Sequence, residues 1–333
     1  MSQAIAVLGS GSWGTALAVH LARTGHDVRL WARDPALASA MTTSRANVAY
    51  LPGIALPNAL TPTAELARAV DGAAFVVMAV PSHGLRSVAR AAAMHLPRAC
   101  TIVSAAKGLE EGSLLRMSDV LRSELPDMGE IVVVSGPSFA LELARELPTA
   151  VVAAGQSSAV VEAVMSHFRS PPMRLYGRAD VIGVELGGAL KNIIAIAAGV
   201  VEGLGLGHNA LAALMTRGLA ELSRLAVAAG AQRETLAGLA GLGDLVLTCT
   251  GDLSRNRKVG IELAHGRQLD AILSSTRMVA EGVRTTQAAL ALSARHDIEM
   301  PIAREMSDVL AGRVDPQTAI KNLMGRKQKL ELA

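Results

Sequence analysis

Along the first half of the chain, short runs of apolar, mostly β-branched residues alternate with stretches in which apolar positions recur at helical spacing. Strands that alternate with helices form βαβ units, and strands that are apolar at every position are buried on both faces of a parallel sheet. We predict strands at Ala4–Leu8, Val28–Ala32, Phe75–Val80, Thr101–Ser104, Ile131–Ser135, Ala150–Ala154 and Met173–Tyr176. The pattern therefore predicts a doubly wound, mostly parallel sheet.

The pattern changes near residue 180, beyond which helical spacing dominates. We predict helices there at Val181–Val201, Ala210–Ala229, Arg233–Leu239, Arg255–His265, Thr285–Arg295, Ile302–Ala311 and Gln317–Met324. The predicted fold class is thus α/β, with a Rossmann-like domain over residues 1–180 and an all-helical domain over residues 181–333. A small-molecule site is expected between two such domains.

Composition argues against several classes of protein. Lys and Arg number 32 and Asp and Glu 29 in 333 residues, a net charge of +3, and the aromatic residues are 3 Phe, 2 Trp and 2 Tyr. Weak charge and few stacking side chains disfavour a nucleic-acid binder that would use the basic segments 255–258 and 326–329. Two cysteines, Cys100 and Cys249, are too few for a disulfide framework or a tetrathiolate zinc site, and we expect no metal.

The chain also lacks the marks of a membrane or secreted protein. Its longest apolar stretch, residues 181–206, contains Glu185, Lys191, Asn192 and Glu202, which an isolated spanning helix would bury at high cost. The first residues lack the basic start and the small-residue cleavage site of a signal peptide. We therefore expect no membrane span and a cytoplasmic location.

The first predicted strand leads into a G-x-G-x-x-G motif formed by Gly9, Gly11 and Gly14. In a βαβ unit the first glycine permits the tight turn, the second lets the backbone approach a pyrophosphate, and the third lets the helix pack against the strand. The N-terminus of the following helix offers free N–H groups to the anion. Because the motif follows a strand and opens a helix, we interpret it as a dinucleotide-binding turn rather than a purely structural one.

The end of the second predicted strand bears on the choice of cofactor. An acidic residue there binds the ribose 2′-hydroxyl of NAD, whereas a nearby arginine accommodates the 2′-phosphate of NADP. Asp34 precedes Pro35 and is more simply a helix N-cap, which leaves Arg33 to face the ribose or to be a solvated arginine at a strand end. We expect NADPH to be favoured, without exclusion of NADH.

Two further strand ends carry polar residues in loops of small residues. Lys107 follows the strand Thr101–Ser104, and Ser138 follows Ile131–Ser135. Ligands of open α/β sheets bind beyond the carboxyl ends of the strands. We interpret Lys107 as a cation aimed at a polar substrate, the alternative being an ordinary surface lysine. Ser138 and its neighbouring backbone N–H groups are candidates to donate to a substrate oxygen or to the cofactor amide.

Lys191 is the most informative single residue. It lies in a predicted helix whose neighbouring positions are almost all apolar or glycine. An ammonium buried there is costly unless it has a partner, and desolvation lowers the pKa of a lysine toward the range that proton transfer needs. We therefore predict that Lys191 is a general acid and base. The alternative is a lysine that extends from the edge of the helix to solvent.

A second group of polar residues lies farther along the helical half. Asp244 stands among glycines and aliphatic residues, where it can cap a helix or orient a catalytic lysine. Arg255 and Asn256 begin a predicted helix. A guanidinium, an amide and a helix N-terminus together can bind a phosphate, although such a segment is often simply a solvated basic face. The residues by themselves leave both alternatives open.

Six motifs follow one another along the chain: G-S-G-S-W-G, S-A-A-K-G-L-E, G-P-S-F-A, L-K-N-I, G-L-G-D-L and S-R-N-R-K. In this order they resemble NAD(P)-dependent glycerol-3-phosphate dehydrogenase of the bacterial type, and the resemblance extends from residue 4 to about residue 325. It implies interconversion of sn-glycerol 3-phosphate and dihydroxyacetone phosphate with NADP(H) or NAD(H). It also implies a place in phospholipid synthesis in the cytoplasm.

The resemblance further implies a set of site residues. Lys191 matches the proton-transfer lysine of the family. Substrate contacts are implied for Lys107, Gly136, Ser138, Lys191, Asp244, Ser254, Arg255 and Asn256. Beside the three glycines, cofactor contacts are implied for Ser12, Trp13, Arg33, Lys107, Ala140, Arg255, Val279 and Glu281. Lys107 and Arg255 are thus shared between the two ligands, and Val279 and Glu281 rest on the resemblance alone.

Two alternatives fit the same domain plan. One is another two-domain reductase such as ketopantoate reductase, whose substrate has a carboxylate and no phosphate. Arg255, Asn256 and the G-P-S-F-A loop argue against it. The other is a non-catalytic dinucleotide-sensing module, which would have no use for a buried Lys191. The sequence leaves the oligomeric state open, a homodimer included.

Overall fold

The computed structural model describes residues 2–275, 281–328 and 330. The described strands are β1 (Ala4–Leu8), β2 (Asp27–Trp31), β3 (Leu60–Thr63), β4 (Phe75–Met78), β5 (Thr101–Ser104), β6 (Ile131–Ser135), β7 (Thr149–Ala154) and β8 (Met173–Arg178). They form one sheet in the order β3-β2-β1-β4-β5-β6-β7-β8, in which neighbours run parallel except for the antiparallel pair β6 and β7. The predicted α/β class with a mostly parallel sheet is confirmed.

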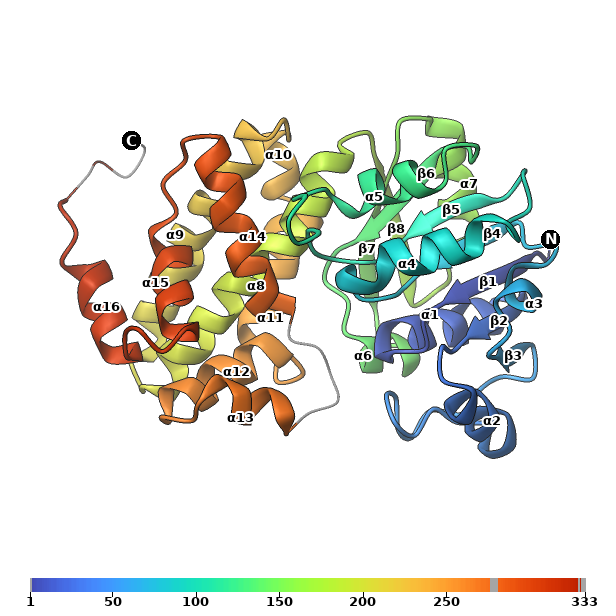
Figure 1. The fold of residues 1–333 in the computed structure, drawn as a ribbon, viewed down its shortest axis with the longest axis horizontal. Coiled ribbons are helices and arrows are strands. Elements are labelled where there is room, and N and C mark those ends of the chain that lie inside the picture. The colour runs from blue at the N-terminus through green and yellow to red at the C-terminus, as the bar shows by residue number, and fades with distance from the viewer. Residues whose placement is uncertain (1, 276–280, 329, 331–333) are drawn as a thin grey trace.

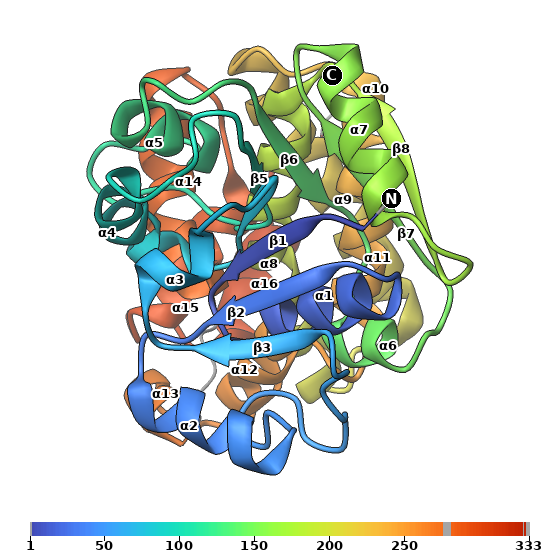
Figure 2. The same cartoon turned by 90° about the vertical axis from the view of Figure 1, so that its right-hand side faces the viewer.

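Helices cover both faces of this sheet. They are α1 (Ser12–Arg23), α2 (Pro35–Ser44), α3 (Leu66–Val70), α4 (Ser82–Ala93), α5 (Met117–Glu124), α6 (Ala140–Ala144) and α7 (Ser158–Phe168). Figure 2 shows α1 and α7 on one side of the strands and α4 and α5 on the other. Because successive residues of a strand point to opposite faces, Ile5 and Val7 pack with α1 and α7, whereas Ala6 and Leu8 pack with α4 and α5.

The strand prediction missed β3, which lies at the edge of the sheet. Its four residues, Leu60–Thr63, contain Pro62, and a proline normally argues against a strand because it has no N–H to donate. At an edge this loss is tolerated, and β3 pairs with β2 along its whole length. β4 also ends at Met78 rather than at the predicted Val80.

The half of the chain after β8 is helical (Figure 1). Its described helices are α8 (Val181–Gly203), α9 (Gly207–Ala228), α10 (Arg233–Leu236), α11 (Asp244–Thr250), α12 (Arg255–Ala264), α13 (Leu269–Ser274), α14 (Glu281–Arg295), α15 (Pro301–Leu310) and α16 (Pro316–Met324). A π-helical turn, η1 (Leu239–Gly243), precedes α11. The predicted helices are all present with shifted ends, whereas η1, α11 and α13 were not predicted, because glycines obscure the first two and α13 is very short.

α8 forms the centre of the helical half, where it packs against α9, α11, α12 and α14. It is long and apolar enough to cross a membrane, but 94% of its apolar window is buried inside the protein. Its first turn also packs on the sheet, because Val181 and Val184 share a buried cluster with Val133 of β6 and Val152 of β7. α8 therefore joins the two halves and carries Lys191 to their junction.

Candidate active site

The glycine-rich turn after β1 requires glycine at two of its three motif positions. Gly9 adopts a φ of +116°, and a Cβ there would lie 2.6 Å from the carbonyl oxygen of Ala79. A Cβ on Gly14 would overlap the carbonyl oxygen of Gly9, so this glycine lets α1 pack against the turn. No atom lies within 4 Å of a Cβ built on Gly11 among the described residues, so the backbone is open there to a ligand. These features fit a dinucleotide whose pyrophosphate lies at the N-terminus of α1.

The loop after α2 holds this turn in place. Asn47 is completely buried, and its Nδ2 donates to the carbonyl oxygen of Ser10 and to Oγ1 of Thr15, each at 2.8 Å. Its Oδ1 accepts from the N–H of Tyr50 at 3.2 Å, and Ser12 Oγ donates to the carbonyl oxygen of Tyr50 at 2.7 Å. Sequence reasoning missed Asn47, because nothing in its neighbours marks a loop asparagine as a brace for a distant turn.

Arg33 lies directly after β2 and is exposed. Asp34 beside it caps α2, because its Oδ1 accepts from the N–H of Ala36 at 2.9 Å, in agreement with the predicted N-cap. Partial burial, and then the charges of Arg284 and Arg33, lower the pKa of His83. The charges of Arg33 and Arg284 thus both act on His83 at this end of the sheet, and a ribose 2′-phosphate is the part of NADP that an arginine there can bind.

Lys191 lies at the junction of the two halves and is 6% exposed. Its Nζ donates to Oδ1 of Asp244, which is 1% exposed, and to Oγ1 of Thr248 at 2.8 Å. Burial lowers the pKa of Lys191 to about 8, against the opposing effect of the Asp244 carboxylate. The lysine is therefore a buried, partnered group and not one that extends to solvent. Thr248 was not singled out from the sequence, although it stands one helical turn after Asp244.

Lys107 reaches the same carboxylate from the other half of the chain. Its Nζ donates to Oδ2 of Asp244 at 2.7 Å and to the carbonyl oxygen of Gly136 at 3.1 Å. Ser138 Oγ also donates to the carbonyl oxygen of Gly136, at 2.9 Å. The loops after β5 and β6 thus meet α8 and α11 around one buried carboxylate. Asp244 is the first residue of α11 and makes no side-chain cap there, so of its two predicted roles the structure shows the contact with the lysine.

Two buried hydroxyls at the ends of the central strands have no partner among the described residues. Ser104 ends β5 and Ser135 ends β6, and neither Oγ has a hydrogen bond within the described part of the chain. Buried polar groups are normally satisfied by protein, water or ligand. Both serines lie at the carboxyl edge of the sheet, the edge where ligands of such folds bind, so these atoms also fit a site that holds a cofactor.

The polar residues at the start of α12 have two roles: Ser254 and Asn256 make structural hydrogen bonds, and Arg255 is exposed. Ser254 caps the helix, because its Oγ accepts from the N–H of Arg257 at 3.2 Å. Asn256 is buried and ties α12 to its neighbours: Nδ2 donates to Oδ1 of Asn192 at 2.9 Å, and Oδ1 accepts from the N–H of Gly282 at 3.0 Å. Arg255 is exposed at the helix N-terminus, where a guanidinium can meet a phosphate. Among the described residues the Arg255 side chain has no hydrogen bond or ion pair, so its guanidinium is available to an anion, whereas the side-chain amide of Asn256 already bonds Asn192 and Gly282.

The remaining predicted cofactor residues are spread over three elements. Glu281 begins α14, and burial raises its pKa while the charge of Arg255 opposes the rise. Ala140 begins α6, and Trp13 lies in the first turn of α1 with a buried Nε1 that has no partner among the described residues. Val279 lies outside the described residues.

The arrangement as a whole can stabilise negative charge that develops on a ligand oxygen. Two ammonium groups flank one buried carboxylate between the carboxyl edge of the sheet and the helical half. A fixed positive group in a dry site acts strongly on an oxyanion, and a lysine of lowered pKa can also donate a proton. In residues 2–275 and 281–328 no three His, Cys, Asp or Glu side chains gather as metal ligands would.

Comparison with protein-family models gives two matches that together cover most of the chain. The model described as the N-terminus of NAD-dependent glycerol-3-phosphate dehydrogenase matches residues 4–161, and the model described as its C-terminus matches residues 180–321. A curated protein from Geobacter sp. (strain M21), named glycerol-3-phosphate dehydrogenase [NAD(P)+], is 50% identical over 333 residues, which are 99% of each chain.

Solved structures show the same relationship. A glycerol-3-phosphate dehydrogenase from Coxiella burnetii superposes with a TM-score of 0.94 at 40% identity, over 98% of this chain and 99% of that one. A ketopantoate reductase from Ralstonia eutropha covers 96% of this chain and all of its own, but with a TM-score of 0.59 and 17% identity it shares the fold alone.

Proposed function

The chain belongs to the NAD-dependent glycerol-3-phosphate dehydrogenase family and is an oxidoreductase that uses a nicotinamide cofactor on a CH–OH group, and we propose that Lys191 is its proton-transfer group. The activity is the reversible reduction of dihydroxyacetone phosphate to sn-glycerol 3-phosphate. One observation carries the proposal for Lys191: its ammonium is buried at the junction of the two halves, and its pKa is lowered to about 8. A non-catalytic dinucleotide sensor would not need such a group.

In the direction of ketone reduction, Lys191 donates a hydrogen bond and then a proton to the ketone oxygen. Negative charge grows on that oxygen as the carbonyl carbon is reduced, and a positive group already in place stabilises it without reorganisation. A lysine with a pKa near 8 remains largely protonated at neutral pH and yet gives up its proton more readily than an exposed lysine does. In the reverse direction the neutral amine accepts the proton.

Asp244 and Lys107 set the position and charge of Lys191. The carboxylate of Asp244 fixes the Lys191 ammonium on one oxygen, and Lys107 holds the other oxygen. Thr248 Oγ1 accepts from Lys191 and itself donates to the backbone carbonyl of Asp244 at 2.6 Å, which orients the remaining donors of the ammonium. Gly136 and Ser138 line the loop beside Lys107 and are the proposed contacts to the substrate on the sheet side.

Arg255 is the proposed anchor for the substrate phosphate. It is exposed at the N-terminus of α12, whose capping residue Ser254 leaves other backbone N–H groups available to an anion. Asn256 contributes indirectly, by holding α12 against Asn192 of α8, the residue after Lys191. This contact fixes the position of Arg255 on α12 relative to Lys191 on α8.

The nicotinamide cofactor supplies and accepts the hydride when it is bound. The glycine turn would hold the pyrophosphate, with Gly11 as the open position, and Arg33 would lie at the ribose. Near the reacting end the proposed contacts are Lys107, Arg255 and Glu281. Ser12, Trp13 and Ala140 are the proposed contacts along the rest of the cofactor. The proposed preference for NADPH rests on Arg33, which is exposed directly after β2 where the ribose would lie. We further propose that the enzyme needs no metal, acts in the cytoplasm for phospholipid synthesis, and divides into its two domains at residue 180.

The proposal is tested by following the near-ultraviolet absorbance of NADPH, and separately of NADH, after addition of dihydroxyacetone phosphate. Rapid oxidation of the cofactor is expected. At a low cofactor concentration, the rate with NADPH should exceed the rate with NADH. Ketopantoate serves as the control substrate, because the ketopantoate reductase shares only the fold. Activity with ketopantoate alone would contradict the assignment of the phosphate site.

A further inference from the structure

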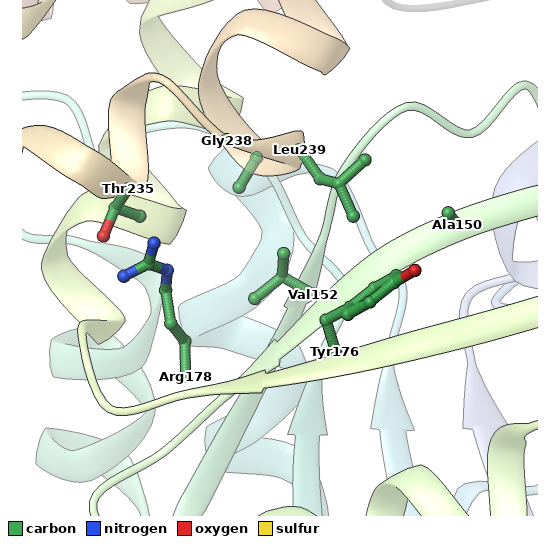
Figure 3. Close-up of a pocket in the computed structure, with 8 residues that line it drawn as sticks. Ala150, Val152, Tyr176, Arg178, Thr235, Gly238 and Leu239 are labelled. Carbon is green, nitrogen blue, oxygen red and sulfur yellow. The ribbon is translucent and has the colours of Figure 1, made fainter.

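A pocket of about 360 Å³ lies apart from the Lys191 cluster, between the strands β7 and β8 and the segment that runs from α10 into η1 (Figure 3). Its lining residues are Ala150, Val152, Tyr176, Arg178, Thr235, Gly238, Leu239 and Ala240. None of them belongs to the substrate or cofactor contacts described above. The volume is sufficient for a small organic molecule.

One end of the pocket is polar and unsatisfied. The Arg178 side chain is half-buried and has no hydrogen bond or ion pair with the described residues. Thr235 is 1% exposed, and its buried Oγ1 also has no partner within the described part of the chain. A buried hydroxyl without a partner costs free energy unless a ligand or a water supplies the bond. A guanidinium beside such a hydroxyl provides donors that suit a carboxylate or a phosphate.

The other end of the pocket is apolar. Figure 3 shows Arg178 and Thr235 together at one end, and Tyr176, Ala150 and Leu239 at the other, with Val152 and Gly238 between them. The guanidinium of Arg174 lies 5.1 Å from the centroid of the Tyr176 ring, within the range of a cation–π contact. An aromatic face and aliphatic side chains of this kind bind the hydrocarbon part of a ligand.

We propose that this pocket is a second ligand site, which binds a small amphiphilic anion. The carboxylate or phosphate of the ligand binds Arg178, and the hydroxyl of Thr235, which is covered in the structure, adds a bond after rotation about χ1. Its aryl or alkyl body lies against Val152, Leu239 and the ring of Tyr176. The division of the pocket into a cationic end and an apolar end selects for a molecule that carries both parts, rather than for an inorganic ion or a neutral hydrocarbon.

The pocket is connected to the Lys191 cluster through η1. Leu239 and Ala240 line the pocket, and the same π-helical turn ends at Gly243, directly before Asp244. η1 also packs closely on α8, because a Cβ on Gly187 would lie 2.6 Å from the carbonyl oxygen of Ala240. Gly187 stands one helical turn before Lys191. A ligand that moves η1 therefore moves Asp244 relative to Lys191, so the site modulates turnover. This step rests on the proposed role of Asp244.

Binding is measured first, by calorimetric titration with benzoate and with phenyl phosphate. The protein is saturated with NADPH and sn-glycerol 3-phosphate, two reduced compounds that cannot react with each other and that occupy the active site. We expect Arg178→Ala to weaken binding at least tenfold, and Thr235→Val to weaken it several-fold without lowering the unfolding temperature. The control is Arg233→Ala, which removes an exposed arginine of α10 that does not line the pocket.

The outcomes separate the alternatives. Binding of benzoate alone identifies a carboxylate site, and binding of phenyl phosphate alone a phosphate site. Absence of binding by both probes, or equal affinity in wild type and Arg178→Ala, overturns the proposal.

A kinetic experiment repeats the reduction of dihydroxyacetone phosphate in the presence of the probe that binds. We expect kcat or KM to change in wild type and not in Arg178→Ala.

Unchanged kinetics with a bound probe would overturn the connection to Asp244. Failure of the proposed function has a different signature. In that case NADPH is not oxidised with dihydroxyacetone phosphate in any variant, whereas the calorimetric difference between wild type and Arg178→Ala is still measurable.

Discussion

Lys107 and Lys191 bind the two oxygens of one carboxylate from opposite halves of the chain, because Lys107 Nζ donates to Oδ2 of Asp244 and Lys191 Nζ to Oδ1. Burial is the main cause of the lowered pKa of Lys191, Asp244 raises that pKa, and Lys107 lowers it. Each charge in the group therefore affects the proton affinity of Lys191 in a direction set by its sign.

Replacement of Lys191 should remove proton transfer. We expect Lys191→Ala to lower kcat for dihydroxyacetone phosphate reduction at least about a hundredfold, the usual scale for loss of a general acid. Stopped-flow or steady-state oxidation of NADPH measures this loss. The control is Lys321→Ala on the exposed surface of α16, which should keep full activity. Near-normal kcat in a folded Lys191→Ala protein would refute the assignment.

The pH dependence of reduction should follow the titration of Lys191. Because the proposed proton transfer needs the protonated ammonium, kcat should fall as pH rises through about 8. Asp244→Asn removes the charge that raises this pKa, so the fall should move to lower pH. Lys107→Met removes a charge that lowers the pKa, so the fall should move to higher pH. Profiles of kcat against pH measure both shifts, and shifts in the same direction would contradict this electrostatic account.

Arg33 should discriminate between the two cofactors. We expect Arg33→Ala to raise KM for NADPH by roughly 10- to 100-fold, the scale of a lost charge-assisted contact, and to leave KM for NADH nearly unchanged. The neighbouring variant Asp34→Ala is a matched control, because it removes the cap of α2 and costs about 1 kcal/mol of stability without touching the 2′-phosphate. Equal losses with both cofactors in Arg33→Ala would rule out the proposed contact.

Replacement of Arg255 should affect substrate binding, whereas replacement of the adjacent Asn256 should affect stability. Arg255→Ala should raise KM for dihydroxyacetone phosphate by roughly 10- to 100-fold, because an exposed guanidinium at a helix N-terminus is lost from the phosphate. Asn256→Ala should lower the unfolding temperature, because it removes the bonds to Asn192 and to the N–H of Gly282. Steady-state kinetics and thermal unfolding of both variants separate the effects. An unchanged KM in Arg255→Ala would count against the phosphate anchor.

Glu221 should make the stability of the helical half depend on pH. Burial raises its pKa to about 7, although the N–H groups of Ala303 and Ile302 at the start of α15 oppose the rise. The fold therefore favours the protonated form, so its contribution is complete below the unfolded pKa, near 4.3, and is lost as pH rises to about 7. The loss amounts to ~4 kcal/mol by linkage.

Denaturant unfolding of wild type and Glu221→Gln between pH 4 and pH 8 measures this effect. The amide side chain of the variant does not titrate and keeps one acceptor oxygen, so the stability of the variant relative to wild type should rise with pH over that range. If the free energies of unfolding of wild type and Glu221→Gln differ by a constant amount from pH 4 to pH 8, Glu221 does not titrate with the raised pKa in the folded protein.

The sequence predicted the elements of the sheet and of the helical half well wherever apolar periodicity was strong. It missed β3, because Pro62 disguises an edge strand, and it missed α11, because Gly241 and Gly243 indicate a loop. The second error matters for the site, since the start of α11 carries Asp244. A helix that begins inside a glycine-rich segment depends on packing against α8, and this packing leaves no periodic signal.

By itself, the sequence determined the glycine turn, the capping role of Asp34 and the apolar surroundings of Lys191, because each depends on neighbouring residues. Only the tertiary structure decided what Lys191 meets. Asp244 lies 53 positions from Lys191 and 137 positions from Lys107, and Asn47 lies 37 positions from Ser10. Contacts over such separations are set by the packing of whole elements against one another. Local patterns record which residues are buried, but the partner of a buried charge is fixed only when the two halves of the chain come together.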